Sequence, residues 1–269
     1  MNIKQIRNAT IKLTYAGTTF LIDPWLAPQH SFSFASIPGK PLHVPDSMKE
    51  HILMPICPLP EGIKEILEGV DAYVVTHLHP DHFDLPTEPG ASTPLDKEIP
   101  IFTQNEADAS VLHQFGFKDV RVIKENGTAF MGVSLIKTPA LHGTIEPCGE
   151  ACGIIFSPAS QKKDTEEKKL YLSGDTIWCS GVKETIRKYS PDVIILNACA
   201  AEIIEYGRLI MNDEDVECVA KAAPNAQIII SHMDNVAHAS ISRYEMRGRL
   251  ARRRINGYLM PEDGEEIKI

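Results

Sequence analysis

Apolar and polar residues alternate at the start of the chain with the period of a β-strand. Residues 9–15 place every second apolar side chain on one face, which is typical of a half-buried strand. A turn at Ala16 and Gly17 follows, and residues 18–22 form a return strand that stops before Asp23. The pattern therefore predicts a β-hairpin that begins close to the N-terminus.

Strand and helix patterns alternate over the rest of the chain. Short apolar runs predict strands at 72–75, 99–102, 120–123, 133–136, 153–156, 170–172, 193–196 and 228–230. Helical spacing and capping residues predict helices over 61–67, after Asn105, after Asn212 and after Ser242. Early hairpin strands with later strand-helix alternation indicate an α/β fold of two sheets covered by helices. We find no repeat or linker, so residues 1–269 are expected to form one domain.

One segment breaks this pattern. Residues 24–60 are rich in Pro, Ser and His and have no period. Loops of this length in a compact domain are usually functional or mobile. We therefore expect the segment to form a wall of the functional site, with Trp25, Phe32 or Phe34 near its mouth, and Trp178 is a further candidate for that mouth.

Composition narrows the class of protein. The chain has 269 residues and is 43% hydrophobic, and this apolar content excludes a mainly disordered chain. Its formal net charge of −9 disfavours a nucleic-acid partner. No apolar run approaches the ~18 residues of a membrane span, and the N-terminus lacks the apolar core of a signal peptide. Six Cys in a chain of this length do not form a disulfide framework. We expect a cytoplasmic protein without a membrane partner, and homo-oligomerisation stays open.

The segment THLHPDHFD, at residues 76–84, follows directly after a predicted buried strand. Its candidate metal ligands are His77, His79, Asp81 and His82. In an extended chain His77 and His79 project to the same side, and the following proline turns the backbone so that the next two point elsewhere. Ligands of two orientations on one tight turn favour two adjacent metal ions over one.

Three further residues, His142, Asp175 and His232, each follow a strand-like run. A single histidine in such a place is more often a solvated or capping residue. The shared placement, at the strand ends where α/β folds carry their sites, favours a common centre. Five His and two Asp suit a pair of divalent ions, with Zn favoured and Mn or Fe as the other choices.

The pattern HxHxDH after a strand, followed by single His, Asp and His residues at strand ends, resembles the metallo-β-lactamase superfamily over residues 9 to about 249. The resemblance implies a four-layer αβ/βα sandwich, with two mixed sheets flanked by helices. It implies one metal on His77, His79 and His142, a second on Asp81, His82 and His232, and Asp175 as the bridge between them. Asp23 matches a carboxylate that braces the metal loop. Residues 9–28, 191–200 and 231–243 resemble the branch that includes L-ascorbate-6-phosphate lactonase.

These observations predict a dinuclear metal-dependent hydrolase with Asp81 and Asp175 in its catalytic centre. A metal-bound hydroxide would attack a small anionic lactone or ester, such as a sugar-phosphate lactone. His238 either donates a hydrogen bond to the substrate or bonds only to backbone.

Two alternatives stay open at this point. The first is a phosphodiesterase or nuclease acting on RNA or nucleotides, because residues 243–254 are rich in arginine, although the same stretch suits the solvated face of a helix. The second alternative is a non-catalytic metal-binding regulatory protein that keeps the fold.

Overall fold

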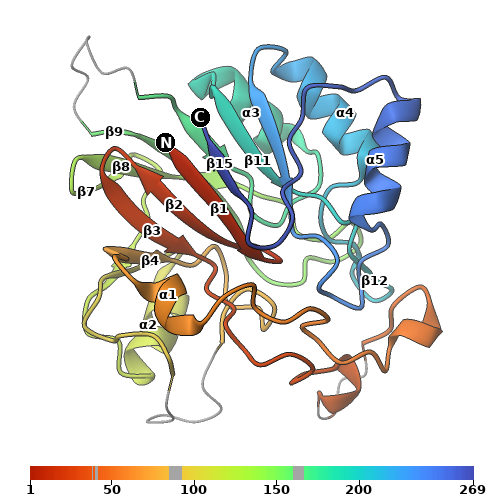
Figure 1. Ribbon diagram of the computed structural model, residues 1–269, viewed down its shortest axis with the longest axis horizontal. Helices are drawn as coiled ribbons and strands as arrows, with labels where there is room; N and C mark the ends of the chain where they lie inside the picture. The colour runs from red at the N-terminus through yellow and green to blue at the C-terminus, as the bar shows by residue number, and fades with distance from the viewer. Residues whose placement is uncertain (38, 40–41, 85–92, 160–166) are drawn as a thin grey trace.

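Two β-sheets pack face to face in the computed structural model, which describes residues 1–37, 39, 42–84, 93–159 and 167–269 (Figure 1). The first sheet has seven strands in the order β15-β1-β2-β3-β4-β5-β6. Their bounds are β1 (Asn2–Arg7), β2 (Thr10–Tyr15), β3 (Thr18–Ile22), β4 (Ala72–Val74), β5 (Ile101–Thr103), β6 (Val120–Val122) and β15 (Glu266–Lys268). Pairing is antiparallel from β15 to β3 and parallel from β3 to β6, so the sheet is mixed.

The second sheet has six strands in the order β14-β11-β10-β9-β8-β7. Their bounds are β7 (Thr128–Phe130), β8 (Val133–Pro139), β9 (Cys152–Pro158), β10 (Leu170–Leu172), β11 (Val193–Asn197) and β14 (Gln227–Ser231). Strands β10, β11 and β14 are parallel, and β7 to β10 are antiparallel. A short separate ribbon pairs β12 (Glu202–Ile203) with β13 (Gly207–Arg208).

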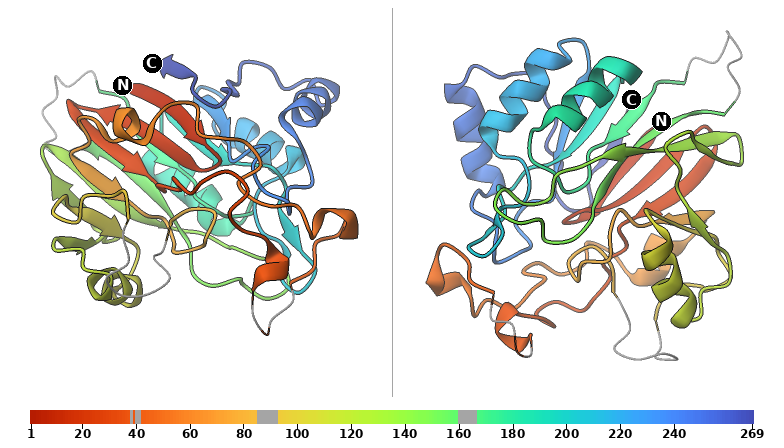
Figure 2. Two further views of the ribbon diagram at one scale, coloured as in Figure 1. Left: turned by 60° about the horizontal axis from the view of Figure 1, so that its bottom comes forward. Right: turned by 180° about the vertical axis from the view of Figure 1, so that it is seen from behind.

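Helices cover the outer face of each sheet (Figures 1 and 2). Helices α1 (Ile63–Leu67) and α2 (Glu106–Gln114) share a core with the first sheet, and α3 (Ser180–Tyr189), α4 (Asp213–Ala222) and α5 (Arg243–Arg252) share one with the second. A third core lies between the sheets. Burial of these apolar faces stabilises the layers by about 25 cal/mol for each Å² removed from water. The predicted α/β fold of two mixed sheets flanked by helices is confirmed.

The observed elements agree with the sequence patterns where the local signal is strong. Residues 18–22 and 170–172 are strands with the predicted bounds. The side chains of Asn105, Asn212 and Ser242 each accept a backbone N–H at the start of a predicted helix. Helix α3 was not predicted; its N-cap is Cys179, which makes no side-chain hydrogen bond.

The strand ends that carry the candidate ligands meet at one edge of the sandwich. His77, His142, Asp175 and His232 follow β4, β8, β10 and β14 respectively. The segment 24–60 runs along this edge, in orange at the bottom of Figure 1, apart from residues 38 and 40–41, which lie outside the described residues. Two 3₁₀ turns, Phe34–Ser36 and Ser47–Lys49, are its helical parts among the residues that the structure describes. Within the same ranges, no helix is both long and apolar enough to cross a membrane.

Candidate metal centre

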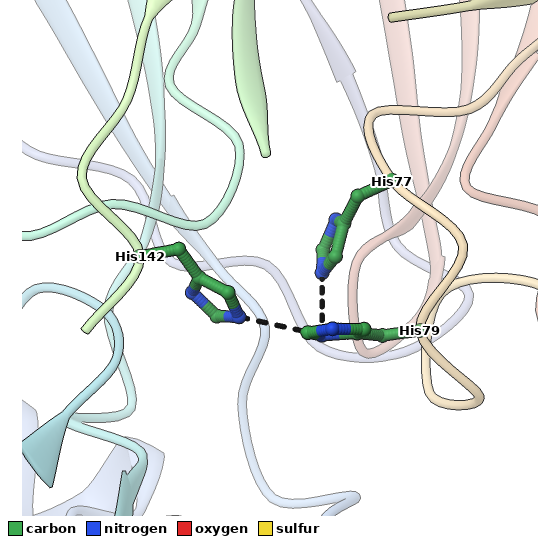
Figure 3. Close-up of side chains that lie close together, drawn as sticks. All are labelled: His77, His79 and His142. Carbon is green, nitrogen blue, oxygen red and sulfur yellow. Dashed lines mark hydrogen bonds between the residues drawn. The ribbon is translucent and has the colours of Figure 1, made fainter. Parts of the chain in front are cut away.

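Three imidazoles meet where β4 and β8 end. Nε2 of His77 lies 3.0 Å from Nδ1 of His79, and Nε2 of His142 lies 3.3 Å from the same Nδ1 (Figure 3). These three donor atoms all lie within 4.8 Å of one another. Figure 3 shows the three rings converging from two loops on opposite sides of the centre. The geometry matches the first ligand set that the resemblance implies.

A second cluster brings together Asp81, His82 and His232. Nε2 of His82 lies 3.1 Å from Nε2 of His232, which is 3.4 Å from Oδ2 of Asp81. Asp175 stands between the clusters: its Oδ2 is 3.2 Å from Nε2 of His82 and 3.9 Å from Nε2 of His77. The structure thus brings all seven sequence-predicted ligands together, with Asp175 within reach of both sets.

Backbone conformation places Asp175 at this point. The preceding residue, Gly174, has φ +60°, and a Cβ there would collide with the carbonyl oxygen of Cys152. Glycine tolerates both the positive φ and the close approach, which residues with a side chain do not. The turn after β10 therefore brings the carboxylate of Asp175 directly against the two clusters.

Asp23, at the end of β3, braces the metal loop from outside. Its Oδ1 accepts the backbone N–H of Thr76 at 2.7 Å, and its Oδ2 accepts the Thr76 hydroxyl at 2.8 Å. The same Oδ2 lies 2.9 Å from Nδ1 of His82. A proton on Nδ1 leaves the Nε2 lone pair of His82 directed into the centre, as a metal ligand requires. Thr76 was not predicted to take part in this arrangement.

The other ligands have outer partners too. Nδ1 of His142 is 3.1 Å from the carbonyl oxygen of Leu209, Nδ1 of His232 is 3.6 Å from Sγ of Cys199, and Nδ2 of Asn197 donates to Oδ1 of Asp175 at 2.7 Å. Cys199 is buried, and its contact with His232 joins residues that are distant in the sequence. A backbone carbonyl such as that of Leu209 has no side-chain signal by which it could have been found.

Burial and neighbouring charges set the protonation states of the ligand side chains, and these states suit the binding of cations. Burial lowers the pKa of His79 to about 4 and holds that of His77 well below its usual value, so both imidazoles are neutral. Burial alone would raise the pKa of Asp175, but His82 and the other imidazoles hold it well below the usual range. Burial likewise opposes charge on His82, yet Asp175 and Asp23 raise its pKa to about 10. Ionised carboxylates and imidazole nitrogens aimed at one point fit borderline divalent ions, which displace protons when they bind.

A cavity of about 150 Å³ opens beside the two clusters. Its wall includes Phe32 and Phe34, as expected for the segment 24–60, together with Ile37, Leu42, Met54, Ile203 and Leu209. Trp25 does not line it. Its side chain is buried under the guanidinium of Arg7, 4.9 Å from the ring centroid, so the expectation that Trp25 lies near the mouth is wrong. Trp178 packs against the helix-covered core of the second sheet and does not line this cavity.

His238 lies on the cavity wall next to the second cluster. Its Nε2 is 3.6 Å from Oδ2 of Asp81, which is beyond hydrogen-bond distance, and its ring meets that of Phe34 edge to face at 5.1 Å between centroids. Burial lowers the pKa of His238 to about 4, so the ring is neutral. Among the residues that the structure describes, the His238 ring makes no hydrogen bond to backbone. The alternative that His238 bonds only to backbone is therefore wrong for its side chain.

The Asp23→Asn variant is expected to bind metal and to turn over substrate about 10- to 100-fold less well. Asparagine keeps the shape but loses the charge, and its amide nitrogen cannot accept the hydrogen bonds that Oδ2 accepts from Thr76 and His82. Metal titration and steady-state kinetics measure the effect. Wild-type metal affinity and activity in Asp23→Asn would show that Asp23 does not orient the loop.

Comparison with known proteins agrees with this geometry. A family profile described as "Beta-lactamase superfamily domain" matches residues 18–233. The chain is 40% identical over 270 residues to the UPF0173 protein YddR of Bacillus subtilis (strain 168), covering 98% of both proteins. It is 36% identical to a possible metal-dependent hydrolase from Veillonella parvula DSM 2008, with a TM-score of 0.87 and coverage of 100% of this chain and 99% of that one. An isothiocyanate hydrolase from Delia radicum gut bacteria is 32% identical, with a TM-score of 0.86 and the same coverage.

Fold, site and relatives together define the class of the protein as a metal-dependent hydrolase. The chain belongs to the beta-lactamase superfamily and, within it, to the UPF0173 proteins. The finer likeness to the L-ascorbate-6-phosphate lactonase branch stays a prediction.

Proposed function

We propose that the protein hydrolyses a small molecule at an electrophilic carbon, using two divalent ions held by the two clusters. The observation that carries this proposal is the place of Asp175, within 4 Å of imidazoles from both clusters and on the lining of the cavity. When bound, divalent ions supply Lewis acidity and a hydroxide nucleophile near neutral pH. We favour Zn, with Mn or Fe as the other choices.

The protein's own residues have separate tasks in this scheme. His77, His79 and His142 would hold one ion, and Asp81, His82 and His232 the other, while Asp175 supplies negative charge between them. Asp23 and Asn197 keep His82 and Asp175 oriented through hydrogen bonds. The cavity wall would position the reacting group beside the centre.

An ester or lactone is the first candidate substrate, since water adds at its carbonyl carbon. An isothiocyanate is the second, because an isothiocyanate hydrolase is 32% identical over the full chain. In that reaction R–N=C=S and H₂O give R–NH₂ and O=C=S: water adds to the central carbon, the C–N bond breaks, and both protons of water end on nitrogen. Both candidates need the same attack by water on an electrophilic carbon.

The phosphodiesterase alternative loses its main support in the structure. The arginines of the stretch 243–254 are mostly paired with acidic side chains. Arg243 bonds Asp234 and Asp263, Arg247 bonds Glu262, and Arg249 and Arg253 bond Asp213, with Glu214 and Glu217 also on Arg253. A neutralised helix face offers little net attraction for phosphates. Apart from the buried Arg243, the arginines therefore fit the solvated face of α5 and its C-terminal end.

A substrate panel tests the proposal. Protein loaded with Zn²⁺ or Mn²⁺ is assayed with phenyl acetate, γ-butyrolactone, benzyl isothiocyanate and bis(4-nitrophenyl) phosphate. We expect metal-dependent turnover of at least one of the three carbon electrophiles, and faster than that of the phosphodiester. Turnover of the phosphodiester alone would favour the nuclease alternative. Two bound ions without any turnover would favour the regulatory alternative.

A further inference from the structure

The cavity beside the metal centre has two unlike sides. One side is the centre itself, and the other is an apolar wall that includes Phe32, Phe34, Met54, Ile203 and Leu209. The rings of Phe32 and Phe34 pack edge to face at 6.0 Å between centroids. A cavity of about 150 Å³ has room for a group the size of a benzene ring. The wall therefore suits one small apolar group.

His238 is the polar exception on that wall. It is 7% exposed, and its Nδ1 has no hydrogen-bond partner in the part of the chain that the structure describes. Its Nε2 has only the long 3.6 Å approach to Asp81. The five imidazoles of the two clusters differ from that of His238, because each has a ring nitrogen in close contact with another nitrogen or oxygen. Nδ1 is shielded from solvent, so Nε2 is the ring nitrogen that a ligand in the cavity can reach. Because buried polar groups are normally paired, the lack of a close partner for Nε2 points to a ligand atom in that place.

Fixed positive charge is absent from the described lining of the cavity, which contains neither Lys nor Arg. The carboxylates on that lining, Asp81 and Asp175, belong to the metal centre. A carboxylate or phosphate pressed on the apolar wall would lose its hydration without gaining a partner, which is costly. These features favour an uncharged group against the apolar wall over the anionic group expected from the sequence.

We infer that the substrate is an uncharged molecule whose apolar group, up to about the size of a benzene ring, packs on the Phe32–Phe34 wall while its polar atom hydrogen-bonds His238. This inference rests on the proposed hydrolysis for the identity of the reacting group. The preference of the cavity for uncharged over charged ligands does not depend on the proposed hydrolysis. The two can therefore fail separately.

Matched pairs of probes test the charge preference. The pairs are phenyl acetate with 4-carboxyphenyl acetate, and benzyl isothiocyanate with 4-carboxybenzyl isothiocyanate. We expect the wild-type protein to favour the uncharged member by at least about tenfold in kcat/KM. The variant Ile37→Lys adds a cation to a half-exposed position on the lining and should narrow or reverse that preference. Equal or better turnover of the carboxylates by the wild-type protein would overturn the inference.

A second arm tests His238 with ligands that cannot be hydrolysed. Binding of benzyl alcohol and 4-carboxybenzyl alcohol is followed by saturation-transfer NMR, with metal content measured for every variant. His238→Leu should weaken benzyl alcohol binding at least about fivefold, with metal content kept. For the uncharged substrates of the matched pairs, it should raise KM more than it lowers kcat. His238→Gln should recover part of the loss, because its amide can still donate or accept. His113→Leu, at an exposed position on α2, is the matched control.

The outcomes separate the two claims. If no probe is hydrolysed by the metal-loaded protein, yet benzyl alcohol binds and His238→Leu weakens it, the proposed hydrolysis of these classes fails and the inference about the ligand stands. If 4-carboxybenzyl alcohol binds as well as benzyl alcohol, or if His238→Leu and His113→Leu bind benzyl alcohol equally well, the inference is wrong whatever the hydrolysis assays give.

Discussion

Replacing Asp175 by Ala is expected to lower kcat/KM by at least about 10³-fold, which corresponds to about 4 kcal/mol of transition-state stabilisation. Its carboxylate lies 3.2 Å from Nε2 of His82 and 3.9 Å from Nε2 of His77, one imidazole from each cluster. Without that shared anion, two cations would face each other across a few ångströms and repel more strongly. We therefore expect at least one ion to be bound poorly as well, which elemental analysis measures beside the kinetics.

Two companion variants sharpen this test. Asp175→Asn keeps the size of the side chain and removes the charge, so it should reproduce most of the loss if charge is what matters. Glu106→Gln removes a carboxylate at an exposed position in the first turn of α2 and should leave kinetics and metal content unchanged. An Asp175→Ala protein with full activity and two bound ions would show that Asp175 is not the bridge.

Dialysis against a chelator is expected to abolish hydrolysis and to lower the melting temperature by about 10 °C. A ligand that binds only the folded state at about a thousandfold above its Kd stabilises it by about 4 kcal/mol, and a chain of this size loses a few degrees for each kcal/mol. Removal of the ions also leaves the buried imidazoles and carboxylates of the centre facing one another. Calorimetry and activity assays, before and after Zn²⁺ is restored, measure both effects.

A double variant supplies the control for this experiment. His77→Ala with His142→Ala removes two of the three imidazoles of the first cluster, so its melting temperature should respond much less to the chelator. A wild-type protein whose activity and melting temperature both survive complete chelation would contradict a metal-dependent hydrolase.

The fold and the seven candidate ligands could be predicted because local signals and strand ends coincide. The run 72–75 marks a buried strand, and His77 and His79 follow it in the sequence as they do in the structure. His142, Asp175 and His232 are far apart along the chain, but each follows a strand of the second sheet. Strands of one sandwich that end at the same edge bring their following residues together. The shared placement of these residues after strands was therefore enough to suggest convergence.

Most of the other supporting residues, and the detailed lining of the cavity, could not be predicted in this way. Leu209 acts through a backbone carbonyl, which any residue would supply. Trp25 was misplaced because Arg7 packs over its ring from β1, a strand that the sequence patterns did not reveal. The position of Phe32 depends on a lone β-bridge to Met54 within a segment that has no hydrophobic period. Such contacts form between distant parts of an irregular loop and leave no repeating pattern in the sequence.

A crystal structure of the protein saturated with Zn²⁺, with anomalous data collected at the zinc edge, tests the dinuclear centre most directly. We predict two peaks per chain about 3.5–4 Å apart. One should lie among His77, His79 and His142, and the other among Asp81, His82 and His232, with Asp175 touching both. A single peak, or peaks elsewhere with both clusters empty at saturating zinc, would contradict the account.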